Sequence, residues 1–113
     1  MKYALLLYDV DENWANVGDE EMRSLYAEYA AVSNESETYG GAELQPKATA
    51  KTLRLRDGDL LVTDGPFAET KEVISGLYLV DAESEERAIE LASRIPTLSR
   101  MGGVIEVRPI VER

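Results

Sequence analysis

Two segments of the chain are apolar at almost every position, Tyr3–Tyr8 and Val73–Asp81. A strand with one face in water alternates apolar and polar side chains, whereas a strand covered on both faces is apolar throughout. Both segments are far shorter than the roughly 18 apolar residues of a membrane span. We therefore predict that they form two central strands of one sheet.

Helical periodicity follows each of these strands. From Asp19, apolar side chains recur every three or four residues behind acidic residues that suit the first turn, and Gly40-Gly41 is the expected stop. The second helix is expected from Ser84, a suitable N-cap, to Ile95, because Pro96 disfavours helical backbone before it. Its predicted buried stripe consists of Ala88, Ile89, Ala92 and Ile95.

A β-hairpin is predicted between the two halves of the chain. Lys51–Arg56 and Asp59–Asp64 are separated by Asp57-Gly58, a dipeptide that favours a two-residue turn with positive φ. Such a turn gives the hairpin one aliphatic face. The predicted cross-strand pairs are Arg56 with Asp59, Leu55 with Leu60, and Leu53 with Val62.

Two shorter strands, Ala42–Gln45 and Val104–Ile110, complete the pattern. The segment Asp9–Gly18 is expected to be a polar loop, and its Trp14 could lid a pocket or anchor the loop. The order is then β-α-β, an inserted hairpin, and β-α-β. This order predicts one α+β domain over residues 1–113, with a ferredoxin-like βαββαβ fold.

Two helices can cover only one face of such a sheet. Because the strand Tyr3–Tyr8 offers apolar side chains to both faces, the other face would expose a larger apolar patch than monomers usually tolerate. A second copy, stacked sheet to sheet, would bury this patch. The pattern therefore predicts a homodimer, a dimeric α+β barrel with a cavity between the sheets. The alternative is a monomer in which the Trp14 loop and the hairpin fold over that face.

The composition excludes several kinds of chemistry. The chain has no cysteine and no histidine, so disulfides and thiolate catalysis are excluded, and we expect no transition metal and no bound cofactor. Any catalysis must use Asp, Glu, Lys, Tyr or Arg side chains. The net charge of −10 argues against nucleic acid as a partner. With no membrane-length apolar run and no signal-peptide pattern, we expect a cytoplasmic protein without a membrane partner.

The segment Val62–Glu72, which includes Asp64-Gly65-Pro66-Phe67, resembles the signature of the DGPF-motif branch of the YCII-related family. The stretches Ala48–Arg56, Ile74–Val80 and Glu106–Pro109 are similar as well, so the resemblance covers nearly the whole chain. It implies a ferredoxin-like protomer and a dimeric α+β barrel. It implies little about activity.

Three features of the resemblance bear on function. The wider family is associated with a proposed His–Asp active-site pair, which cannot be carried over because this chain has no histidine. Members of the branch resemble bacterial proteins encoded beside extracytoplasmic-function sigma factors, which implies a regulatory role as one hypothesis. Related sequences tend to have glycine where this chain has Ser75.

Asp64 opens the signature and is the candidate catalytic residue. A carboxylate at a strand end that faces a cavity could act as a base. The alternative is an Asx turn, in which the side chain accepts hydrogen bonds from the following amides, Gly65 supplies an unusual φ and Pro66 stiffens the loop. Lys71, which acidic residues flank, either joins a solvated ion-pair cluster or meets an anionic ligand. Pro66 and Lys71 are therefore also candidate ligand-binding residues.

The other candidate ligand-binding residues lie in strands and in the signature turn. Arg108 is expected beside Glu106 on the sheet face away from the helices, where it could bind a carboxylate of a ligand or of a partner subunit. Tyr8 and Tyr78 either place hydroxyl groups in the cavity or belong to the core. Phe67 is either a packing anchor for its loop or a platform for a substrate.

The sequence leaves three functional hypotheses open. The first is a dimer that binds a small polar or anionic metabolite between its sheets, with or without catalysis. The second is a regulatory or scaffolding dimer without catalytic activity, linked to sigma-factor-type transcriptional control. The third, a cofactor-independent oxygenase or isomerase, rests on analogy of fold alone.

Overall fold

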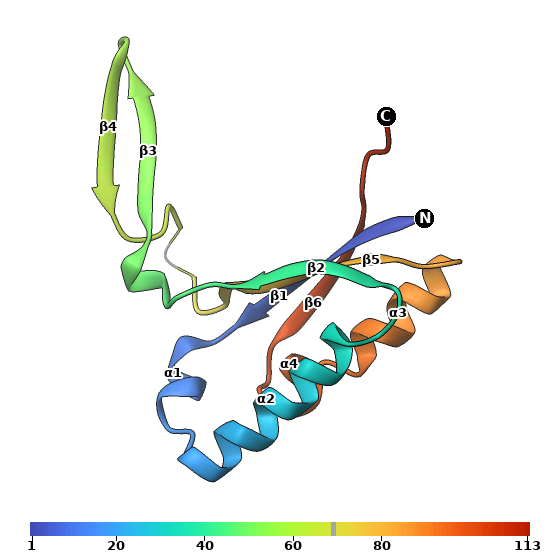
Figure 1. Ribbon diagram of the computed structural model, residues 1–113. Helices are drawn as coiled ribbons and strands as arrows, with labels where there is room; N and C mark the ends of the chain where they lie inside the picture. Colours follow the sequence, from blue (N-terminus) through green and yellow to red (C-terminus); the bar gives the residue numbers. More distant parts are fainter. Residues whose placement is uncertain (69) are drawn as a thin grey trace.

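The computed structural model describes residues 1–68 and 70–113, and Figure 1 shows the arrangement of its elements. No helix in these residues is long and apolar enough to span a bilayer. In chain order the elements are β1 (Lys2–Asp9), α1 (Asp11–Ala15), α2 (Asp19–Ser33), β2 (Thr38–Glu43), the 3₁₀ turn η1 (Lys47–Thr49), β3 (Lys51–Arg56), β4 (Asp59–Asp64), β5 (Val73–Asp81), α3 (Glu85–Ser93), α4 (Pro96–Ser99) and β6 (Val104–Pro109).

A four-stranded antiparallel sheet forms the body of the protein, with strand order β2-β5-β1-β6. The two strands that are apolar throughout, β1 and β5, are the central pair, as predicted. The helices α2, α3 and α4 lie together on one side of this sheet (Figure 1). Strand order and crossovers are those of a ferredoxin-like βαββαβ domain, so the predicted α+β fold class is confirmed.

The hydrophobic core lies between the helices and one face of the sheet. Alternate residues of β1 face it, because successive side chains of a strand point to opposite faces. The large side chains that are fully buried there come from β1, β5, α2, α3 and the residue before α4: Leu5, Val80, Leu25, Val32, Leu91 and Ile95. The opposite face of the sheet carries no helix (Figure 1).

The buried stripe of α3 differs from the prediction at one position. Ala88, Ala92 and Ile95 are buried as expected, but Ile89 is 51% exposed and Leu91 takes its place in the core. Steps of three and four residues from Ala88 select Leu91, Ala92 and Ile95, which share one helix face. Ile89 follows Ala88 directly and therefore points away from that face.

Several predicted boundaries are wrong. Helix α2 ends at Ser33, and Gly40-Gly41, the expected stop, lies inside β2. Strand β2 spans Thr38–Glu43 instead of the predicted Ala42–Gln45. A Cβ on Gly41 would lie only 2.5 Å from the carbonyl oxygen of Leu77 in β5, so the close pairing of these strands requires glycine there. The expected loop Asp9–Gly18 contains α1. The helix that was expected to run to Ile95 ends at Ser93, and Pro96 is the first residue of α4.

The predicted hairpin is confirmed together with its register. Strands β3 and β4 form a separate two-stranded sheet, and both turn residues have positive φ, 52° at Asp57 and 84° at Gly58. The observed pairs include Arg56 with Asp59, Leu55 with Leu60, and Leu53 with Val62.

The hairpin extends away from the body instead of lying over the open face of the sheet (Figure 1). Its aliphatic side chains Leu53, Leu55, Leu60 and Val62 are 57% to 77% exposed. Trp14 packs against Tyr29 of α2, on the helix side of the sheet. The monomer alternative, in which the Trp14 segment and the hairpin cover the open face, is therefore wrong for this chain.

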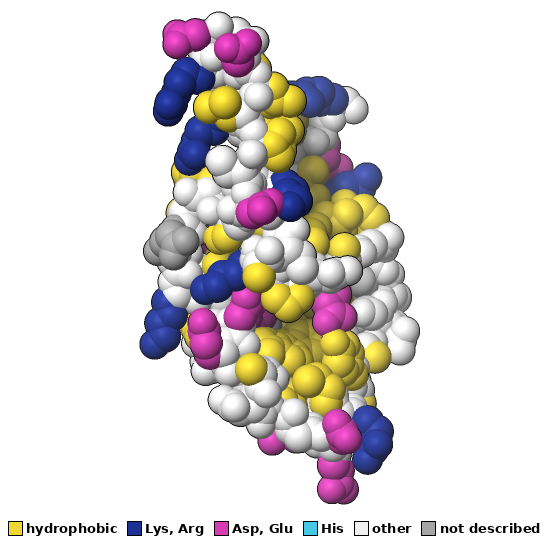
Figure 2. Space-filling view, turned by 90° about the vertical axis from the view of Figure 1, so that its left-hand side faces the viewer, with side chains coloured by type: hydrophobic (Ala, Val, Ile, Leu, Met, Phe, Trp, Pro, Cys, Tyr) yellow, Lys and Arg dark blue, Asp and Glu magenta, His cyan; other side chains and the backbone are white. Residues whose placement is uncertain are grey.

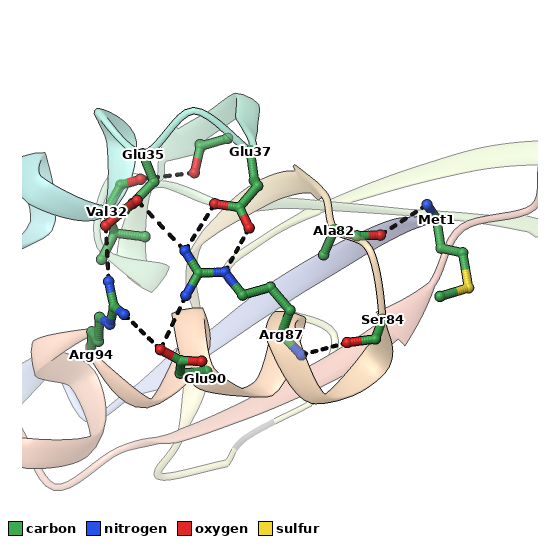
Figure 3. Close-up of polar contacts among 10 residues, drawn as sticks. Met1, Val32, Glu35, Glu37, Ala82, Ser84, Arg87, Glu90 and Arg94 are labelled. Atoms are coloured by element: carbon green, nitrogen blue, oxygen red, sulfur yellow. Dashed lines mark hydrogen bonds and ion pairs between the residues drawn. The ribbon is translucent and has the colours of Figure 1, made fainter.

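A network of charged side chains ties the loop between α2 and β2 to α3 (Figure 3). The Arg87 guanidinium donates to both carboxylate oxygens of Glu37, from Nε at 2.6 Å and from Nη2 at 3.0 Å. Glu90 bridges Arg87 at 3.0 Å and Arg94 at 2.7 Å, and Arg94 reaches Glu35 at 2.9 Å. The predicted N-cap, Ser84, is confirmed, because its Oγ accepts a hydrogen bond from the Arg87 backbone N–H. The network therefore fixes the start of the edge strand β2 on α3.

We predict that Arg87→Met destabilises the fold at neutral pH more than in acid. Hydrogen bonds from Arg87 lower the pKa of Glu37, and those from Arg94 lower the pKa of Glu90. These hydrogen bonds stabilise the fold fully above the ordinary glutamate pKa of 4.5. Their contribution is lost as the pH falls through the lowered pKa values of Glu37 and Glu90. Urea unfolding at neutral and acidic pH measures the difference. Arg23→Met, on α2 outside the network, is the control, and an Arg87→Met deficit that does not shrink in acid would contradict the assignment.

Candidate functional site

A cavity of about 770 Å³ lies on the helix side of the sheet, between α1, α2 and the edge strand β2. Figure 2 views the end of the molecule that carries α1 and the hairpin, and a hollow of hydrophobic side chains is visible below the hairpin. The β2 wall includes Gly40, Gly41 and Ala42, and Gly41, which pairs with the cavity-lining Tyr78, has no side chain. Cavities of this size with mostly apolar linings are typical of small-molecule sites.

Three aromatic rings form the wall of the cavity opposite β2. Helix α1 supplies Trp14, and α2 supplies Tyr26 and Tyr29, which share one helix face because they are three residues apart. The Trp14 ring centroid lies 5.9 Å from that of Tyr29 and 6.4 Å from that of Tyr26. Trp14 is therefore part of the wall of this cavity, which lies on the helix side of the sheet and not in the predicted space between two sheets.

The Asp9 carboxyl group lies at the base of the cavity and is 1% exposed. Its Oδ2 accepts hydrogen bonds from the hydroxyl groups of Ser75 and, at 3.3 Å, Thr97. The Tyr29 hydroxyl lies 2.8 Å from Thr97 Oγ1 and extends this chain of hydrogen bonds toward the aromatic wall. Burial of a carboxyl group is costly unless such partners satisfy it.

A β-bulge in β5 brings Ser75 to Asp9. Leu7 pairs with Gly76 and Tyr8 pairs with Ile74, so Ser75 is an extra residue without a partner on β1. Bulges of this kind redirect a side chain and are frequent beside functional sites. The position where related sequences tend to have glycine thus carries a hydroxyl group that donates to Asp9.

The second oxygen of Asp9, Oδ1, is buried and has no hydrogen-bond partner among the described residues. A Cβ on Gly103 would lie 2.9 Å from this oxygen and 2.8 Å from Thr97 Cγ2, so the site leaves room for glycine alone. An unsatisfied buried acceptor costs roughly 1–3 kcal/mol.

Three of the tyrosines that line the cavity, Tyr26, Tyr29 and Tyr78, have a raised pKa. Burial strongly raises the pKa of Tyr29 and also raises that of Tyr78. At the mouth, the Tyr26 hydroxyl donates to Glu43 Oε1 at 2.6 Å, and this hydrogen bond raises the pKa of Tyr26. These phenols therefore act as hydrogen-bond donors, not as bases.

The structure separates the predicted strand residues onto two faces of the sheet. Tyr78 lines the cavity, and its hydroxyl donates to the Tyr29 carbonyl at 2.9 Å. Tyr8 and Arg108 lie together on the open face, where the Tyr8 hydroxyl donates to Glu106 at 2.8 Å and Arg108 approaches Glu106 at 3.8 Å. The hydrogen bond to Glu106 raises the pKa of Tyr8. A cavity between two sheets would form only with a second chain over this face.

The signature turn lies at the base of the hairpin, and its described residues do not line the cavity. The Asp64 side chain is 84% exposed and pairs with Lys51 across the hairpin, in place of the burial or the Asx turn that were expected. Gly65 has the expected positive φ, 93°. Phe67 is 77% exposed, Pro66 is partly buried and Lys71 is exposed. Residue 69 lies outside the described residues, and the functional roles of the turn stay predictions.

Sequence reasoning missed Asp9, Ser75 and Thr97 as one site. Two signals for it exist in the sequence. Asp9 ends a strand that is otherwise apolar, and Ser75 is a polar residue within the other apolar strand. Thr97 carries no comparable signal, because its contact with Asp9 spans 88 positions. In the described part of the chain, no group of three acidic side chains is placed to hold a metal ion.

Comparison with known proteins agrees with these features. The family model of the YCII-related domain matches residues 1–113. An uncharacterized protein of Rhizobium meliloti (strain 1021) is 38% identical over 114 residues, which cover 97% of this chain and 92% of the relative. The family model matches the full chain, which is sufficient to assign the chain to this family. The ferredoxin-like body described above is compatible with this assignment. The chain therefore belongs to the YCII-related domain family.

Proposed function

We propose that the protein binds a small molecule in the cavity between α1, α2 and β2. The observation that carries the proposal is the Asp9 carboxyl group, buried at the base of an aromatic cavity with one oxygen unsatisfied. A mostly apolar pocket with a few fixed polar groups is the usual form of a small-molecule site. This site lies on the helix side of the sheet, whereas the sequence had suggested a cavity between two sheets.

We also propose that the chain belongs to the DGPF-motif branch of the family. The eleven-residue signature Val62–Glu72 supports placement in the DGPF-motif branch. Its position at the base of the hairpin keeps it apart from Asp9, so the ligand would be held by residues outside the signature.

We predict that Ala30→Phe weakens binding in the cavity by about tenfold or more, because the larger side chain occupies the ligand volume. Ala30 lines the cavity, whereas the neighbouring Ala31 does not and provides the matched control Ala31→Phe. The probe is N-phenyl-1-naphthylamine, a neutral dye that fluoresces in apolar surroundings and accepts energy from Trp14, the single tryptophan. Saturable binding that both variants retain equally, or no saturable binding by the parent, would contradict the proposed site.

We also propose that the protein is a homodimer. The open face of the sheet carries the half-buried aliphatic side chains Ala4, Leu6, Leu77 and Leu79 without a helix over them. The hairpin adds a second aliphatic surface, and an isolated two-stranded hairpin is at best marginally stable in water. Both surfaces would be covered if a second copy stacked on the open face.

The dimer predicts an effect of Leu79→Glu on association. A charge placed in an apolar interface should raise the dimer dissociation constant by about tenfold or more. The control is Ile89→Glu, which makes the same kind of change on the exposed surface of α3. Light scattering should give about 25 kDa, two chains of 12.5 kDa, for the parent and for Ile89→Glu at concentrations where Leu79→Glu is monomeric. A parent mass of 12.5 kDa at micromolar concentration would refute the dimer.

A further inference from the structure

We propose that the cavity selects an organic cation, an alkylammonium or quaternary ammonium compound. This inference rests on the proposed function, because it names the class of ligand for the same cavity. It follows from three properties of the walls: their acidic side chains, their aromatic rings and the buried carboxyl group behind their base.

The charged residues that line the cavity are all acidic. Asp9 lies at the base, Asp11 at the start of α1 and Glu43 at the mouth, and no Lys or Arg lies among the lining residues that the structure describes. Lys47 follows the lining residue Pro46, but its ammonium group points toward Glu12, 3.9 Å away, and its backbone N–H donates to Asp11. An anionic ligand would therefore meet repulsion, contrary to the expectation of an anionic metabolite.

The aromatic wall adds an attraction that favours cations over neutral molecules. The faces of tryptophan and tyrosine rings carry partial negative charge, and cages of such rings bind quaternary ammonium groups. Along one wall, the ring centroids of Tyr26 and Tyr29 lie within 6.4 Å of the Trp14 ring centroid. Their phenols stay protonated, so the rings attract a cation without a phenolate charge.

The Asp9 carboxyl group adds an acidic group behind the base of the cavity. Ser75 and Thr97 both donate to Oδ2 of Asp9, whereas Oδ1 is buried against Gly103, which does not line the cavity. Asp9 therefore offers a cation its acidic character and not a direct hydrogen bond at Oδ1. An alkylammonium group brings N–H donors together with positive charge, and a quaternary ammonium group brings the charge alone.

Fluorescence of Trp14 tests the inference directly, because the single tryptophan lies in the wall of the site. Choline and 3,3-dimethyl-1-butanol have the same shape and differ in a charged nitrogen against a neutral carbon. We expect choline to change the emission saturably and to bind about tenfold more tightly than the alcohol. Butylammonium, compared with choline, shows whether N–H donors add to the affinity.

Glu43→Gln removes one acidic group from the mouth and should weaken choline binding severalfold while leaving the alcohol unaffected. Glu83→Gln, in an exposed position outside the cavity, should change neither affinity and is the matched control. Equal binding of choline and the alcohol, or no saturable effect of either ammonium compound, would overturn the cation inference. The proposed function fails separately, if the neutral naphthylamine dye does not bind the parent protein.

Discussion

The burial of one carboxyl group constrains much of the sequence around the cavity. Asp9 ends the central strand β1 and is 1% exposed, so neighbouring elements must supply hydrogen bonds that water cannot. Ser75 reaches it through a bulge in β5, and Thr97 reaches it from α4, at the turn that follows α3. Gly103 leaves the space that the carboxyl group occupies. Three separate parts of the chain thus converge on one side chain, yet one of its oxygens stays unsatisfied.

The cavity above Asp9 results from how the edge strand meets the helices. Gly41, which pairs with Tyr78 on the helix side of the sheet, has no side chain to fill the space beside the aromatic wall. The Arg87–Glu37 pair holds the start of β2 against α3 and keeps this edge in place. The opposite face of the sheet has a different chemistry, with Tyr8, Glu106 and Arg108 joined near its aliphatic centre. We therefore propose a ligand on the helix side of the sheet and a second chain on its open side.

Local patterns predicted the fold well, and they predicted the site poorly. The central strands, the hairpin register and the Ser84 cap follow from periodicity and turn chemistry, which act over a few residues. Gly40-Gly41 resembles a helix stop in the local sequence. The reason for glycine at Gly41 is the close approach of Leu77, which lies 36 residues further along the chain. Asp64 belongs to a compact motif that is recognisable in the local sequence. The contacts of Asp9, in contrast, are with Ser75 and Thr97, which lie 66 and 88 positions away. Short-range signals do not encode such contacts.

The central claim is that Asp9 is kept buried for a ligand and not for the fold. The most direct measurement is urea unfolding of Asp9→Asn beside the parent, at matched protein concentration, together with choline affinity from Trp14 fluorescence. The amide oxygen can still accept from Ser75 and Thr97. We expect a free energy of unfolding within about 0.5 kcal/mol of the parent or above it, with choline affinity reduced about tenfold. A loss of roughly 2 kcal/mol or more with unchanged affinity would show that Asp9 serves the fold instead.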